Sequence, residues 1–176
     1  PKRTDCLPPL APRHRCRSAL YRPPGGAFFR SDTMPVFASY EKFALSVSQA
    51  ESCALVIGNF DGVHRGHQAL IAEARRHATS AGTVIVMTFA PHPAKVLAPQ
   101  NAPALILSPA RKRELLLQSG ADVVVEQPFD AAFAQLSATE FVERIILAGP
   151  QLRAVCVGHD FRFGRDRAGD GTLLSR

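Results

Sequence analysis

From residue 53 onward, two patterns of apolar and polar positions alternate along this chain: short apolar runs, and apolar residues spaced three and four apart. Short apolar runs, rich in β-branched residues, predict four buried strands over residues 53–57, 83–89, 122–127 and 152–157. Apolar residues spaced three and four apart predict amphipathic helices over residues 66–80, 108–120 and 137–149. Repeated strand–helix units favour an α/β fold, a Rossmann-like parallel sheet with helices on both faces.

Local signals mark the boundaries of two of these helices. Ser108 followed by Pro109 is typical of a helix start, and Gly120 closes the same helix. Ser137 and Glu140 have the spacing of a capping box. The proline-rich stretch between residues 90 and 107 is expected to be a loop.

Three of the predicted strands end in unusual polar segments, and parallel sheets bind ligands at the carboxyl ends of their strands. The first segment, here called the histidine motif, is GNFDGVHRGH at residues 58–67. It places His64 and His67 where a strand passes into a helix, next to unpaired backbone N–H groups and the positive end of the helix dipole. Such a position suits phosphate. The alternatives are ordinary loop and helix-cap histidines, or a metal pair that needs a third ligand such as Asp61.

The two other segments are expected near the same edge of the sheet. The proline motif, TFAPHP at residues 88–93, contains His92, which taken alone reads as a rigid loop with an exposed ring. The arginine loop, residues 158–170, follows the last strand. Here Asp160 could accept a hydrogen bond from a ring N–H or a ribose, and Arg162 could contact phosphate. Without such a ligand the same residues read as a plain strand edge.

Other common sites are absent from the sequence. It contains no GxxxxGK[ST] phosphate loop, no GxGxxG dinucleotide fingerprint and no GxSxG elbow. The four cysteines form no CxxC pair, which argues against a zinc or redox motif. Buried free thiols fit a reducing cytoplasm, where we expect the protein to be located.

Charge is concentrated at the N-terminus. The net charge is +6, but residues 1–33 hold seven Lys/Arg and two acids and so supply most of it. The remainder is nearly neutral, so nucleic acid is not an expected partner, and no apolar run is long enough for a membrane span. Residues 1–33 are rich in proline and are expected to be disordered and outside the domain, which would comprise residues 34–176. Met34 could be the true start; a targeting segment is the alternative.

The three segments together resemble the adenylyltransferase (FAD synthetase) module of bacterial bifunctional riboflavin kinase/FMN adenylyltransferases. That family carries GxFDGxHxGH, TFxPHP and GxDFRFG segments with a later Gly-Asp, and this chain has them in order at residues 58–67, 88–93 and 158–170. The HxGH tetrapeptide alone marks a wider nucleotidyltransferase superfamily. The FDG prefix together with DFRFG is more specific to the branch that forms FAD.

The resemblance implies transfer of AMP from ATP to FMN, giving FAD and diphosphate, with Mg²⁺ accompanying ATP. It implies catalytic roles for His64 and His67. It implies roles in the ATP phosphate site and in the flavin or nucleotide pocket for further residues; no protein ligand for a metal is assigned. The phosphate-site residues are Gly58, Asn59, Phe60, Asp61, Gly66 and His92, and the pocket residues are Thr88, Pro93, Asp160, Phe161, Arg162 and Phe163.

Two departures from the family pattern lead to further expectations. An ISSTxIR segment that helps to hold the triphosphate in the family would follow Arg176, and the riboflavin kinase module is expected in the full-length protein but absent here. We therefore expect a truncated chain. The alternatives are an inactive or ligand-binding fragment, or another HxGH enzyme such as a pantetheine-phosphate adenylyltransferase or a cytidylyltransferase.

Overall fold

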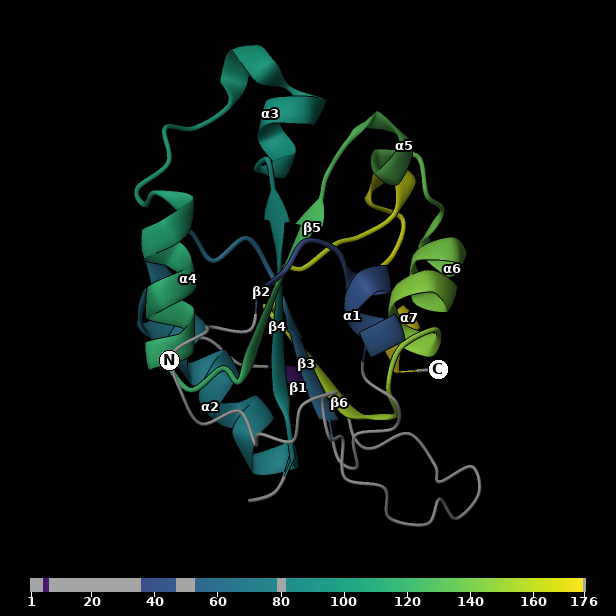
Figure 1. Ribbon diagram of the computed structural model, residues 1–176. Coiled ribbons are helices and arrows are strands. Elements are labelled where there is room, and N and C mark those ends of the chain that lie inside the picture. The colour runs from purple at the N-terminus through teal and green to yellow at the C-terminus, as the bar shows by residue number, and fades with distance from the viewer. Residues whose placement is uncertain (1–4, 7–35, 47–52, 79–81, 176) are drawn as a thin grey trace.

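The computed structural model describes residues 5–6, 36–46, 53–78 and 82–175 (Figure 1). Most of the N-terminal stretch predicted to be disordered lies outside these residues. The exception is β1 (Asp5–Cys6), which pairs antiparallel with β6 and therefore differs from the expected disorder at those two positions.

Within the described residues the strands form one six-stranded sheet in the order β1-β6-β3-β4-β5-β2. All neighbouring pairs except β1·β6 are parallel, which confirms the predicted parallel α/β sheet. The four predicted strands are confirmed, and the two-residue β2 was not predicted. The strands after β1 are β2 (Val36–Phe37), β3 (Cys53–Ile57), β4 (Val84–Ala90), β5 (Val123–Pro128) and β6 (Leu152–Val157).

Helices cover both faces of the sheet, as Figure 1 shows. On one face, α2 (Arg65–Ala78) and α4 (Pro109–Gln118) bury Ile71 and Leu116 against alternate strand residues such as Val56. On the other face, α1 (Tyr40–Ser46), α6 (Ala138–Phe141) and the π-helical segment η3 (Val142–Leu147) pack against the intervening strand positions. Because successive strand residues point to opposite faces, the central strands β3, β4 and β6 are buried on both sides, which explains their apolar runs.

The predicted helix over residues 66–80 is observed as α2, and residues 79–80 lie outside the described residues. The predicted signals at the ends of the two later helices are confirmed. The Ser108 hydroxyl accepts from the backbone N–H of Arg111 at the start of α4, and Gly120 just beyond that helix has a φ of 104°. Ser137 and Glu140 form the predicted capping box, although the helix that follows continues with wider π turns. No helix among the described residues combines the length and apolarity needed to cross a membrane.

The predicted loop between residues 90 and 107 is partly wrong. It contains the helix α3 (Pro93–Leu97) and a 3₁₀ turn η2 (Pro99–Asn101). Proline in the first turn suits both, because its missing N–H would have no partner there. Four further short elements complete the chain: η1 (Asp61–Val63), α5 (Ala131–Ala134), η4 (Arg165–Arg167) and α7 (Gly171–Leu174).

The strand order creates a switch point between β3 and β6. From β3 the chain proceeds to β4 and β5 on one side, and then returns to β6 on the other side of β3. In open parallel sheets, ligands bind in the crevice beyond the carboxyl ends of strands at such a point. The histidine motif follows β3 and the arginine loop follows β6, so both motifs flank this crevice.

Candidate functional site: a cleft at the switch point of the sheet

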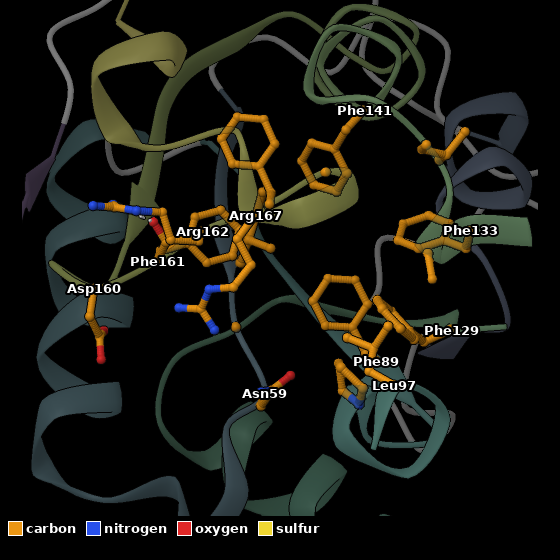
Figure 2. A pocket seen from close by; sticks show the side chains of 18 of the residues that line it. Asn59, Phe89, Leu97, Phe129, Phe133, Phe141, Asp160, Phe161, Arg162 and Arg167 are labelled. Carbon is orange, nitrogen blue, oxygen red and sulfur yellow. Dashed lines mark hydrogen bonds between the residues drawn. The ribbon is translucent and has the colours of Figure 1, made fainter. Parts of the chain in front are cut away.

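A cleft of about 560 Å³ opens at this edge of the sheet. Its volume is within the range usual for small-molecule sites. The end of β3 and the histidine motif contribute Asn59 and His67, while the arginine loop contributes Asp160 and Arg162. Figure 2 shows Phe89, Phe129 and Phe133 on one side of the cleft and the arginine loop on the other.

A continuous row of aromatic rings, here called the aromatic wall, runs across the cleft from β4 to the arginine loop. Neighbouring rings lie with their centroids 4.9 to 6.2 Å apart, mostly edge-on or tilted. These distances are typical of favourable aromatic pairs. Such a wall offers an apolar surface on which a flat ring system could lie. The wall consists of Phe89, Phe129, Phe133, Phe141, Phe163 and Phe161.

The two motif histidines lie together at the start of α2. Their rings are stacked, with centroids 3.7 Å apart and an interplanar angle of 15°. His67 lines the cleft, and its ring also contacts the buried ring of Phe60 edge-on. His64 is more exposed and packs on the outer side of His67. The sequence-based prediction that this motif brings the imidazoles together next to the other two motifs therefore agrees with the structure.

His64 is the N-terminal cap of α2. Its Nδ1 accepts from the backbone N–H groups of Gly66 and His67 at 3.2 and 3.4 Å. A Cβ on residue 66 would lie 3.1 Å from the His64 ring, so glycine gives the ring room there. Because Nδ1 accepts, the proton of neutral His64 is on Nε2, which remains a donor. The backbone N–H groups expected to face phosphate are thus used by the His64 ring, and the ring nitrogens become the candidate phosphate contacts.

His67 is held neutral at physiological pH. Burial, and secondarily the neighbouring His64, lower its pKa from 6.5 to about 4, while Asp61 opposes the shift. Its buried Nδ1 has no hydrogen-bond partner among the described residues. Buried polar atoms in folded proteins are nearly always bonded, so the missing partner sets this ring apart from an ordinary core histidine.

The depressed pKa of His67 predicts a pH-dependent stability. Between pH 6.5 and about 4, the unfolded state binds a proton that the folded state does not. Stability should therefore be fully present above pH 6.5 and fall as the pH drops towards 4. Urea unfolding at pH 7 and pH 4.5 measures the loss, and His67→Asn should lose less than the unmodified chain. An equal loss in both would contradict the assignment.

The side chains of Asp61 and His92 accept hydrogen bonds from backbone N–H groups. The Asp61 carboxylate accepts from the backbone N–H groups of Ile106 and Leu107 at 3.0 to 3.2 Å. Burial opposes ionisation of Asp61, yet these backbone bonds lower its pKa overall. His92 caps α3, its Nδ1 accepting from the N–H of Ala94, and burial lowers its pKa. Neither residue lines the cleft, although both lie in motifs that border it.

A half-buried lysine, which the sequence reasoning missed, links three segments beneath the cleft. Lys112 of α4 donates through Nζ to Thr88 Oγ1 at 2.9 Å and more weakly to the carbonyl oxygen of Asn59 at 3.4 Å. Thr88, fully buried in β4, donates to the same Asn59 oxygen at 3.0 Å. Burial lowers the pKa of Lys112, although Glu126 and Asp61 oppose that shift. Lys112 therefore fixes the backbone where β3 enters the histidine motif.

Replacing Lys112 with methionine should loosen this junction. The substitution keeps the length of the side chain but removes a charged donor, so we expect a loss of about 1 kcal/mol and a thermal midpoint lower by about 2–4 °C. The exposed Lys95 of α3 offers a matched control, because Lys95→Met removes the same charge nearby. Thermal unfolding followed by circular dichroism compares the two; equal shifts would contradict the role given to Lys112.

The predicted site residues divide into two groups. Those that line the cleft are Gly58, Asn59, Phe60, His67, Pro93, Asp160, Phe161, Arg162 and Phe163. Those that lie behind or beside it are Asp61, His64, Gly66, Thr88 and His92. Sequence reasoning missed further lining residues, among them Leu97, Phe129, Phe133 and Arg167. For Phe129 and Phe133 the sequence offered one signal. They lie four residues apart, on either side of Asp130, the residue that caps α5.

Comparisons with known proteins identify the family to which this chain belongs. The fold and the position of the cleft define a Rossmann-like α/β protein with its candidate site at the switch point. The family described as FAD synthetase matches residues 46–176. The chain therefore belongs to the FAD synthetase family, as the sequence resemblance predicted.

Individual relatives agree with this placement. The bifunctional riboflavin kinase/FMN adenylyltransferase of Escherichia coli (strain K12) is 39% identical over 133 residues, covering 75% of this chain and 42% of that protein. The protein of the same description from Pseudomonas fluorescens is 44% identical over 123 residues, covering 69% and 39%. The chain thus spans less than half the length of these relatives. A solved structure described as a macrolide-efflux protein from Streptococcus pneumoniae is 28% identical, with a TM-score of 0.64 over 77% of this chain and 52% of that one.

Proposed function

We propose that this chain is an FMN adenylyltransferase, which transfers AMP from ATP to FMN and releases diphosphate. One observation carries the proposal: a single cleft joins an aromatic wall to a stacked histidine pair at a helix start. The wall suits a flat flavin ring, and the histidines suit phosphate groups. Membership of the FAD synthetase family supports the same reaction.

The reaction asks the protein mainly for positioning. An FMN phosphate oxygen attacks the α-phosphorus of ATP, a new P–O–P bond forms, and the bond to the diphosphate leaving group breaks. The second pKa of a phosphate monoester is about 6, so the attacking oxygen is already ionised at neutral pH and needs no general base. The remaining barrier comes from bringing two anions together. Donors such as His64 Nε2 and the His67 ring lower this barrier by holding the ATP phosphates in place.

Magnesium enters this proposal as part of the ATP complex. Among the described residues there is no group of three His, Cys, Asp or Glu side chains that could hold a metal ion. The carboxylate of the histidine motif, Asp61, already accepts hydrogen bonds from the backbone N–H groups of Ile106 and Leu107. Mg²⁺ commonly binds through substrate phosphates and water, so the residues present fit an ion carried by ATP but not a built protein cage.

Two wider proposals accompany this one. The relatives carry a riboflavin kinase activity in the same chain, and we propose that this adenylyltransferase domain, starting near Met34, is joined to such a module in the full-length protein. Cys53 and Cys156 are buried, and neither is in a disulfide among the described residues; this is consistent with a reducing compartment, so we propose the cytoplasm as its location.

The test is incubation of the chain with labelled ATP, FMN and Mg²⁺, followed by chromatography for FAD. Parallel reactions with 4′-phosphopantetheine, or with CTP in place of ATP, test the other HxGH chemistries. FAD as the dominant product supports the proposal. A preference for another acceptor, or neither FAD formation nor FMN binding, would contradict it.

A further inference from the structure

Arg167 is a cleft residue to which the sequence reasoning assigned no role. It lines the cleft with an exposed side chain, and Figure 2 shows it extending into the opening between the aromatic wall and Asn59. Among the described residues, its guanidinium has no ion pair and no hydrogen bond. Arg162, the arginine expected to contact phosphate, donates instead to the carbonyl oxygen of Phe161 at 3.2 Å. Arg167 is therefore the more available cation of the arginine loop.

The backbone that carries Arg167 is strained. Asp166 and Arg167 have φ angles of 57° and 58°, in the left-handed region that non-glycine residues rarely occupy. Consecutive residues in this region persist only where the surroundings fix them, and such strain gathers at ligand sites.

Contacts on both sides fix this part of the loop. Phe163 and Gly169 form an antiparallel bridge with hydrogen bonds of 3.1 and 2.8 Å, and the N–H of Arg165 donates to the Leu136 carbonyl oxygen at 2.7 Å. The N–H of Arg167 itself donates to the carbonyl oxygen of Gly164 at 3.1 Å. These contacts fix the backbone at Arg167, from which its side chain enters the cleft.

We propose that Arg167 binds the phosphate of FMN, the attacking group of the reaction; this inference rests on the proposed function. A flavin ring on the aromatic wall and an ATP triphosphate at the histidine pair leave the FMN phosphate between them. Arg167 extends into that interval. Its planar guanidinium can donate two parallel bonds to phosphate oxygens. The carboxylates of the same loop, Asp160 and Asp166, would repel the phosphate, so the cation also offsets their charge there.

Binding of FMN and of riboflavin, which lacks the phosphate, tests the proposal. Both are titrated into the 176-residue chain and followed by quenching of flavin fluorescence. Arg167→Gln should weaken FMN binding by about ten- to a hundredfold, the effect of losing a charge-assisted phosphate contact, and leave riboflavin binding unchanged. Arg167→Lys should lie between, because it keeps the charge but loses the paired donors. Arg153→Gln is the matched control: it removes an equal charge from an exposed position on β6, outside the cleft lining, and should change neither affinity.

Each other outcome is informative. If Arg167→Gln leaves FMN affinity unchanged, weakens FMN and riboflavin equally, or weakens ATP binding in place of FMN binding, the proposal is overturned. If the unmodified chain binds neither flavin, the proposed function fails first, and this inference fails with it. Thermal midpoints of all variants, measured in parallel, show whether a lost affinity comes from a lost fold.

Discussion

Replacing Gly164 with alanine is expected to disrupt the arginine loop and to cost the chain about 2–6 kcal/mol of stability. Gly164 has a φ of 74° and a ψ of 169°, a region that is almost exclusive to glycine. A Cβ there would lie 2.6 Å from the backbone nitrogen of Ala138 and 2.7 Å from its Cα. These atoms belong to the start of α6, so they cannot move aside as a side-chain end could. Backbone strain and overpacking each contribute roughly 1–3 kcal/mol.

Urea unfolding monitored by circular dichroism measures this loss, and flavin fluorescence measures the accompanying loss of FMN binding. Gly171 provides a matched control: a Cβ there meets no atom within 4 Å. Gly171→Ala lies in α7 and should be neutral or stabilising by up to about 1 kcal/mol. Since typical domains are stable by only about 5–15 kcal/mol, the two variants should be easily distinguished. Similar unfolding midpoints for both would show that the loop relaxes around Gly164.

The parts of this fold that the sequence predicted correctly are those governed by local rules. The buried strands follow from apolar runs such as residues 53–57, because a strand covered by helices on both faces needs no polar side. The start of α4 follows from Ser108 and Pro109, whose side chain and ring act on adjacent backbone groups. The histidine motif was correctly placed for the same reason, since a strand that ends at Ile57 fixes where the next helix can begin.

The parts that could not be predicted depend on contacts between distant residues. Lys112 is one of several cations in its helix, and its sequence position does not reveal that β4 will bring Thr88 within 2.9 Å. The position of Arg167 in the cleft depends on a positive φ and on a bridge between Phe163 and Gly169, neither of which leaves a local pattern. The helix α3 was missed for a different reason. Its prolines suggested a loop, although Pro93 stands in the first turn, where proline is well tolerated.

The same division applies to the electrostatics of the site. The sequence predicts the paired histidines at a helix start as phosphate donors, but the protonation of His67 depends on burial, which the sequence does not reveal. The stack of His64 on His67 and the contact with Phe60 exclude water from the His67 ring and lower its pKa to about 4. An approaching triphosphate would supply the negative charge and the hydrogen-bond partner that the ring lacks. Phosphate binding should therefore raise the pKa of His67 towards its usual range.

His67→Ala is expected to reduce FAD formation by at least about a hundredfold while the fold is retained. Removing one preorganised donor to a charged transition state commonly costs about 10²–10³ in rate, and His67 is the histidine of the pair that lines the cleft. The ring is only partly buried, so its removal should leave the sheet and α2 intact. The measurement is the initial rate of FAD formation from ATP and FMN, with an ATP titration by calorimetry and a thermal midpoint for each variant.

His77 gives a matched control for this change, because it lies at the opposite end of the same helix and its Nε2 lies 3.4 Å from Glu73 Oε1. His77→Ala should keep its turnover and its ATP affinity, since His77 is not among the residues that line the cleft. If His67→Ala retains most of the rate, or if both variants lose it equally, the histidine pair does not act on the reacting phosphates. Other donors of the cleft would then have to stabilise the reacting phosphates, and Arg167 would be the first to test.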